Sequence, residues 1–157
     1  MDKITNITFA GLGGQGVLKA SDILAEAVFK TGLDVKKSEV HGMSQRGGSV
    51  CSEVRYGGQV NSPMVPDGEV DYLVVLADDQ VDVNRYRLRS DGVLITPADL
   101  TAEMRQNSKG LNVALLGVLS RHLPNIPEKD WLAAIADNLP EKVHEQNFAL
   151  FKQAAGK

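Results

Sequence analysis

The segment HGMSQRGGSV, residues 41–50, places several reactive side chains between two segments with the pattern of strands. His41 and Ser44 are types that act as general base and nucleophile, but no carboxylate adjacent in the sequence can orient the histidine. Arg46 precedes two glycines that leave its guanidinium unobstructed, which suits an anionic group or the backbone of a partner. We interpret the segment as a loop next to a partner or substrate, with a plain polar turn as the alternative. The residues of this loop are His41, Met43, Ser44, Gln45, Arg46, Gly47 and Gly48.

A second motif, GLGGQG at residues 11–16, follows an apolar strand pattern and opens a helical one. Its G-x-G-x-x-G spacing allows close approach of a ligand to the backbone, and free N–H groups at a helix N-terminus attract an anion. A dinucleotide also needs an acidic residue after the second strand to bind the ribose, and Glu39 is the candidate. A tight turn that binds nothing is the alternative. The anion-contact residues are Gly11, Gly13, Gly14, Gln15 and Gly16.

The elements that position these motifs alternate between strand and helix patterns. The sequence after residue 49 indicates a strand, a Gly-Gly turn and a returning extended segment, so a β-hairpin is expected after the second strand. The apolar run DYLVVLA predicts a strand buried on both faces. The expected strands are residues 4–11, 33–40, 49–63 with its turn, 71–77 and 92–96, and the expected helices begin at residues 17 and 80.

The C-terminal third has a helical pattern throughout. LNVALLGVLSRHL, PEKDWLAAIADNL and EKVHEQNFALFKQAA each show helical apolar spacing and are separated by prolines. The sequence therefore predicts an α/β fold: a Rossmann-like three-layer sandwich with a mostly parallel sheet, a β-hairpin insertion after the second strand and a helical C-terminal third. Residues 1–157 are expected to form a single domain.

Composition excludes several classes of function. The net charge of -3 gives no general attraction to nucleic acid or anionic lipid. The apolar runs are shorter than the roughly 20 residues needed to span a membrane, and no signal-peptide pattern is present, so a cytoplasmic protein is expected. Cys51 is the only cysteine, which excludes an internal disulfide and leaves no thiolate cluster for a metal.

Five other polar residues have ordinary structural interpretations. His122 and His144 lie on helical segments and are expected to be solvated surface residues. Cys51 is expected to be a small core residue. Asn112 and Asn147 are each expected to be a helix cap or a surface residue.

Several segments together resemble the gamma subunit or domain of 2-oxoacid:ferredoxin oxidoreductases. They are GLGGQGV, LKASDILAEA, VHGMSQRGGSVCSEVRYG and NSPMVPDGEVDYLVV. Within this family the chain is most similar in pattern to the small (beta) subunit of indolepyruvate ferredoxin oxidoreductase, in which HGMSQRGGSV is typical. GLNVALLGVL and HEQNFALFKQA also resemble the distal segments of the family, so the likeness covers most of the chain.

The resemblance implies a subunit of a complex that oxidatively decarboxylates a 2-oxoacid with coenzyme A to acyl-CoA and CO2, and reduces ferredoxin. Thiamine diphosphate, Mg2+ and iron–sulfur clusters are then expected in a large partner subunit, because this chain lacks the GDG motif and the cysteines that they need. The isolated chain is expected to bind none of them and to be inactive, although its glycine turn could contact coenzyme A. The alternatives are an independent NAD- or FAD-binding oxidoreductase and a non-catalytic scaffold subunit.

Overall fold

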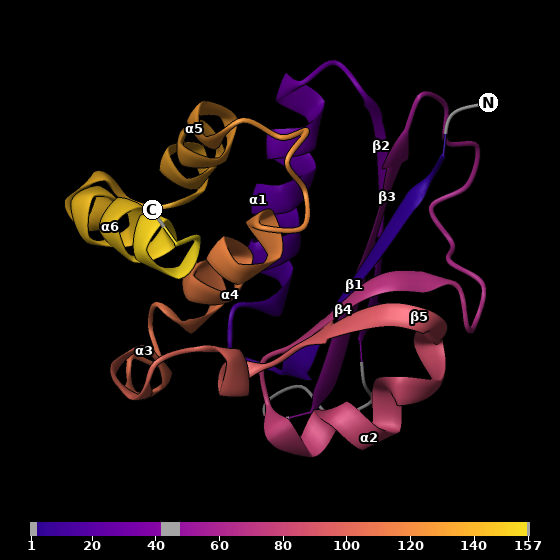
Figure 1. The fold of residues 1–157 in the computed structure, drawn as a ribbon, viewed down its shortest axis with the longest axis horizontal. Coiled ribbons are helices and arrows are strands. Elements are labelled where there is room, and N and C mark those ends of the chain that lie inside the picture. The colour runs from indigo at the N-terminus through magenta and orange to yellow at the C-terminus, as the bar shows by residue number, and fades with distance from the viewer. Residues whose placement is uncertain (1–2, 42–47, 157) are drawn as a thin grey trace.

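The computed structural model describes residues 3–41 and 48–156, which alternate between strands and helices (Figure 1). Short 3-10 turns precede and follow α2. The strands and helices are β1 (Thr5–Leu12), α1 (Val17–Lys30), β2 (Asp34–His41), β3 (Ser49–Gly57), β4 (Val70–Val75), α2 (Val81–Asn84), β5 (Leu88–Ile95), α3 (Ala102–Gln106), α4 (Leu111–Ser120), α5 (Glu128–Asn138) and α6 (His144–Ala154).

One five-stranded sheet with the order β2-β3-β1-β4-β5 forms the centre of the protein. β1 and β4 are parallel, as are β4 and β5, whereas β3 runs antiparallel to both β1 and β2. The predicted α/β class is confirmed, but the sheet is mixed instead of mostly parallel. The reason is the short connection from β2 to β3, since a parallel pair needs a crossover of about a dozen residues or more.

The β-hairpin is formed by β2 and β3, so the second strand is one of its arms. The two strands pair from Asp34 opposite Gly57 to His41 opposite Val50. The returning strand expected after Gly57 was wrong, because residues 58–69 hold no strand. Arg55 provides a physical reason: its Nη1 donates to the carbonyls of Ser62 (3.0 Å) and Met64 (2.7 Å). A side chain thus supplies the partners that a strand ladder would otherwise provide.

Four of the helices, α1, α4, α5 and α6, lie on one side of the sheet. α1 and α4 pack against the sheet, and α5 and α6 pack outside them (Figure 1). α1 buries Val17, Leu24 and Val28, which recur at the helical spacing expected from the sequence. α4 is buried all round from Leu111 to Leu119 because it lies between the sheet and α6. The predicted helical C-terminal third is therefore confirmed.

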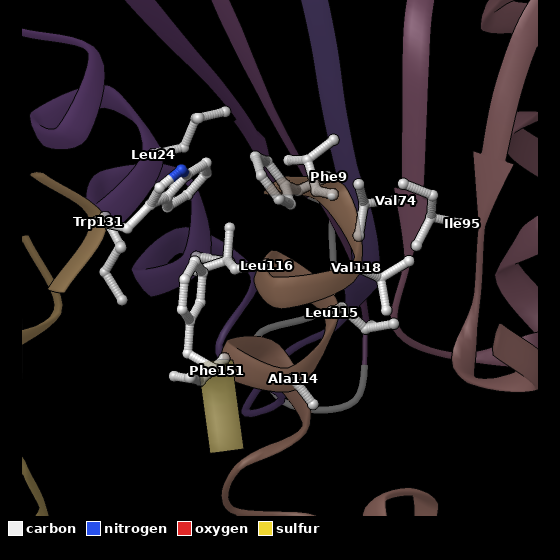
Figure 2. Close-up of a cluster of buried hydrophobic side chains, with 14 of the residues drawn as sticks. Phe9, Leu24, Val74, Ile95, Ala114, Leu115, Leu116, Val118, Trp131 and Phe151 are labelled. Carbon is white, nitrogen blue, oxygen red and sulfur yellow. The ribbon is translucent and has the colours of Figure 1, made fainter. Parts of the chain in front are cut away.

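The larger core lies between the sheet and these helices (Figure 2). Phe9 from β1, Leu24 from α1 and Leu116 from α4 are fully buried there. Trp131 of α5 and Phe151 of α6 close the outer side, with ring centroids 5.4 Å apart. Each such side chain contributes about 1.5–3 kcal/mol to stability on burial. This core fixes α1 and α4 on the sheet, and with them the turns that precede both helices.

A smaller core covers the opposite face of the sheet. Cys51, Val65, Leu73 and Val75 are buried in it, and Val81 of α2 packs against them. β4 is therefore buried on both faces, as its apolar run predicts. The expected helix from residue 80 is present as α2 and its flanking turns, which end at Arg87. The second face thus has a thin layer made of α2 and the segment after β3.

Candidate functional site

The two predicted loops meet at one edge of the sheet. Leu12, the last residue of β1, lies opposite Ser49, the first residue of β3. The backbone N–H of Gly13 then donates to the carbonyl of Gly48 at 2.9 Å. The glycine turn is therefore joined to the carboxyl-terminal end of the segment 41–50. Sequence separation hid this contact, because only the antiparallel pairing of β1 and β3 brings the two together.

This edge also contains the point where the direction of the chain connections reverses. α1 connects β1 to strands on one side of it, while β4 lies on the other side. In open α/β sheets, ligands bind outside the carboxyl ends of the strands at such a point. The carboxyl ends of β1 and β4 are thus the expected ligand position, and the glycine turn borders them.

The glycine turn depends on residues without a side chain. Gly14 and Gly16 have φ angles of 91° and 86°, in the left-handed region that glycine adopts without strain. Gly16 is the N-cap of α1, and no side chain caps this helix end. Gly14 is exposed, with nothing within 4 Å of the position of an added Cβ. The outer side of the turn therefore has room for an anionic group that contacts only the backbone.

Gln15 occupies the position between these two strand ends. Its Oε1 accepts a hydrogen bond from the backbone N–H of Leu12 at 2.8 Å, and its Nε2 donates to the carbonyl of Leu76 at 3.4 Å. A Cβ on Gly11 would lie 2.9 Å from the same Oε1. Gln15 thus ties the end of β1 to the end of β4. The sequence placed Gln15 in the turn but gave no sign of this contact with β4.

Asn112 of α4 closes the other side of the glycine turn. Its Nδ2 donates to the carbonyl of Gly16 at 3.3 Å, and an added Cβ on Gly16 would lie 2.5 Å from that nitrogen. The expectation of a cap or surface residue was wrong for Asn112, which is buried and links two helices. Asn147 of α6 is also buried, and its side chain donates to the carbonyl of Val143, the residue before the start of that helix.

A polar cluster lies beneath α2, next to the same edge. Ser49 donates through Oγ to Oε1 of Gln80 at 2.8 Å, and Asn84 donates through Nδ2 to the Gln80 carbonyl at 2.8 Å. Asn84 Oδ1 accepts from the Cys51 thiol (3.4 Å) and from Nε of Arg87 (3.0 Å). Burial raises the pKa of the Cys51 thiol, which confirms the interpretation of Cys51 as a core residue.

Glu53 extends this cluster into the sheet. Its carboxylate lies 3.5 Å from Arg87 and accepts from the backbone N–H of Val65 at 3.4 Å. Burial is the main cause that raises the pKa of Glu53, and the Val65 N–H and Arg87 oppose it. The sequence did not single out Gln80, Asn84, Glu53 or Arg87, because none belongs to a local motif.

The two histidines that the sequence placed on helical segments differ in their environments. His122 is exposed, as expected, and its ring lies 5.5 Å from that of Tyr72. His144 is partly buried: its Nε2 is 2.7 Å from the carbonyl of Leu139, and its ring packs on Phe148 at 5.5 Å. The expectation of a solvated His144 was therefore wrong.

Part of the predicted loop lies outside the described residues. His41 takes part in β2 through its backbone pairing with Val50, and Gly48 is buried beside the glycine turn. The predicted loop residues outside the described part of the chain are Met43, Ser44, Gln45, Arg46 and Gly47.

Glu39 is badly placed for a dinucleotide ribose. It is exposed on β2, where its carboxylate pairs with Lys37. β3 separates β2 from β1, so Glu39 is two strands away from the glycine turn. In the dinucleotide fold the acidic residue follows the strand next to β1.

A metal-binding cluster and a membrane-spanning helix are both absent from residues 3–41 and 48–156. No group of three or more His, Cys, Asp or Glu side chains there could hold a metal ion. No helix in the same ranges is long and apolar enough to cross a membrane.

Comparison with known proteins identifies relatives over most of the chain. Indolepyruvate oxidoreductase subunit IorB of Pyrococcus horikoshii is 45% identical over 95 residues, which are 59% of this chain and 46% of that protein. The chain thus spans less than half of that relative. Indolepyruvate oxidoreductase subunit IorB of Methanothermobacter thermautotrophicus is 31% identical over 96% of both chains. That alignment is 191 positions long, so this relative has residues that the 157-residue chain lacks.

Solved structures and a family model agree with these relatives. The gamma subunit of a keto/oxoacid ferredoxin oxidoreductase from Geobacter sulfurreducens superposes with a TM-score of 0.76 at 25% identity, over 96% of this chain and 95% of that one. Pyruvate oxidoreductase subunit PORC from Thermotoga maritima has the same fold, with a TM-score of 0.77 at 21% identity over 99% and 97% of the two chains. The model of the pyruvate ferredoxin/flavodoxin oxidoreductase family matches residues 6–106, which include the glycine turn and β1 to β5. The chain therefore belongs to the pyruvate ferredoxin/flavodoxin oxidoreductase family.

Proposed function

We propose that the chain is the small, accessory subunit of a 2-oxoacid:ferredoxin oxidoreductase of the indolepyruvate type. The complex would oxidatively decarboxylate a 2-oxoacid with coenzyme A to acyl-CoA and CO2, and would pass the electrons to ferredoxin. The observation that carries the proposal is the 31% identity with the IorB subunit of Methanothermobacter thermautotrophicus over 96% of both chains. The whole of residues 1–157 would act as one domain of this complex.

We place the contribution of this chain at the edge where the two loops meet. The turn Gly11–Gly16 would contact an anionic group, such as a phosphate of coenzyme A, through its backbone. The uncapped start of α1 and the open space beside Gly14 support this assignment. The loop His41–Gly48 would lie against the partner subunit or near the substrate, and the bond between Gly13 and Gly48 supports a joint role for the loop and the turn.

The decarboxylation chemistry belongs to the partner in this proposal. Thiamine diphosphate with Mg2+ stabilises the carbanion that decarboxylation leaves, and iron–sulfur clusters carry single electrons to ferredoxin. One cysteine, Cys51, cannot supply the four thiolates that a cluster needs, and it is buried on the sheet. This chain would instead complete the binding surface of the large subunit.

Two observations weigh against an independent dinucleotide-binding oxidoreductase. The Gln15 carboxamide is bonded to the ends of both β1 and β4, at the position where a dinucleotide would lie. Glu39 lies on the far strand and pairs with Lys37. The scaffold alternative differs from our proposal in one respect, because a scaffold needs neither the glycine turn nor Arg46 for turnover.

The test is co-expression with the candidate large subunit encoded in the same gene neighbourhood, followed by co-purification and a ferredoxin-reduction assay with 2-oxoacids and coenzyme A. Arg46→Ala should weaken assembly or turnover by roughly 30-fold, since an anion left unpaired in a desolvated contact costs about 2 kcal/mol or more. Arg46→Lys should restore only part of it, because an ammonium lacks the bidentate fork.

Arg85→Ala is the matched control, because this exposed arginine next to α2 pairs with Asp82 in its own turn. It should leave assembly and turnover unchanged. A wild-type chain that neither co-purifies with the large subunit nor supports turnover would contradict the proposed function.

A further inference from the structure

We infer that Gln80 is a positioning residue that holds the end of the segment 41–50, at Gly48 and Ser49, against the glycine turn. The inference goes beyond the family resemblance, because it concerns a side chain after β4 that belongs to neither motif. Its consequence for turnover rests on the proposed function.

Gln80 is fixed by the elements around it. It is 9% exposed, and its backbone N–H donates to the carbonyl of Ala77 at 2.9 Å. The side chain of Asn84 donates to the Gln80 carbonyl, and Asn84 is in turn held by the thiol of Cys51 on β3. Asn84 is 4% exposed, so water has little access to compete for these bonds. Gln80 therefore presents its Oε1 from a rigid base.

Ser49 is the residue that Gln80 holds. Ser49 is exposed, and its Oγ donates to Gln80 Oε1 at 2.8 Å. The neighbouring Gly48 accepts the hydrogen bond from the Gly13 N–H. The Ser49 bond thus joins the segment to Gln80 at the start of α2, and the Gly48 bond joins it to the glycine turn. An exposed serine adds little to global stability, so loss of its bond should open this contact locally and leave the fold intact.

The same edge receives a second, independent tie. Gln15 joins β1 to the carbonyl of Leu76 at the end of β4, four residues before Gln80. The stretch from Leu76 to Gln80 thus contacts the glycine turn through one glutamine and the end of the segment 41–50 through the other. The residues that follow β4 therefore hold both the glycine turn and the end of the segment 41–50, at Gly48 and Ser49.

The first arm of the test measures amide hydrogen exchange at Gly13 in the isolated chain. Ser49→Ala and Gln80→Leu should each speed this exchange about fivefold to tenfold, the population change that follows from loss of one neutral hydrogen bond. The double variant should be no faster than either single variant, because both remove the same bond. Ser49→Thr keeps the hydroxyl and should exchange like the wild type.

The second arm measures turnover of the co-purified complex. kcat/KM should fall in Ser49→Ala, and Ser49→Thr should restore it, whereas the thermal midpoint should stay at the wild-type value. Unchanged Gly13 exchange in Ser49→Ala and Gln80→Leu overturns the inference, and so does faster exchange with wild-type kcat/KM. A wild-type complex without turnover contradicts the proposed function alone, because the exchange arm uses the isolated chain.

Discussion

Replacement of Gly16 by alanine tests how the glycine turn and α4 depend on each other. Gly16 has a φ of 86°, so an alanine there should cost about 1–2 kcal/mol of backbone strain. The new Cβ would also lie 2.5 Å from Asn112 Nδ2, so Asn112 must move and lose its bond to the Gly16 carbonyl. A buried amide left without this partner costs about 1–3 kcal/mol more. We therefore expect Gly16→Ala to lower the free energy of unfolding by about 2–5 kcal/mol.

Gly14→Ala is the matched control for this prediction. Its φ of 91° imposes the same strain, but nothing lies within 4 Å of its Cβ position. Gly14→Ala should thus lose only about 1–2 kcal/mol. At about 3 °C per kcal/mol, Gly16→Ala should lower Tm by roughly 6–15 °C and Gly14→Ala by roughly 3–6 °C in thermal unfolding. Asn112→Ala should remove most of the difference when combined with Gly16→Ala. Equal losses for the two glycine variants would refute the contact with Asn112.

Three further substitutions test other parts of the structure. Gln15→Ala should lower the free energy of unfolding by about 1–3 kcal/mol in urea titration, because the Leu12 N–H and the Leu76 carbonyl lose their side-chain partner. An unchanged urea midpoint would contradict this role. Gly117→Ala should cost about 1–3 kcal/mol by the same measurement, since its Cβ would lie 2.6 Å from the Phe151 carbonyl, and a neutral effect would mean that α4 and α6 separate freely. Burial raises the pKa of Tyr56 to about 12, whereas an unfolded tyrosine ionises near 10, so the folded state binds the proton more tightly and stability should fall as pH rises through this window. Tyr56→Phe should flatten that fall in alkaline unfolding curves, and curves of equal slope for both proteins would show that Tyr56 ionises normally when folded.

The parts of the fold that follow from local patterns could be predicted from the sequence. The spacing of apolar residues in β4, α1 and α4 is enough to predict that these elements are buried. GLGGQG likewise specified a strand, a tight turn and a helix, since a turn of this shape needs glycine at Gly14 and Gly16.

The parts that depend on long-range pairing could not be predicted. The position of β3 between β1 and β2 results from chain reversal, and the spacing of residues within β3 does not specify which strands lie beside it. Gln15, Gln80 and Asn112 contact residues 61, 31 and 96 positions away. Their roles depend on the assembled sheet edge, and a polar residue in a turn or helix start carries no local mark of such a partner.

The central position of β1 has a consequence for the order in which the chain can fold. β2 and β3 are neighbours in sequence and can pair early as a local hairpin, whereas β1 needs β3 on one side and β4, which ends at Val75, on the other. During synthesis β1 can therefore pair with β3 once Gly57 has emerged, but it gains its second neighbour only when the chain as far as Val75 has emerged. Its apolar residues Ile7 and Phe9 are exposed for that interval, and they gain a complete cover only when α4 arrives. β1 is thus a strand whose burial depends on segments far along the chain, which leaves its apolar residues open to aggregation or to chaperone binding during synthesis.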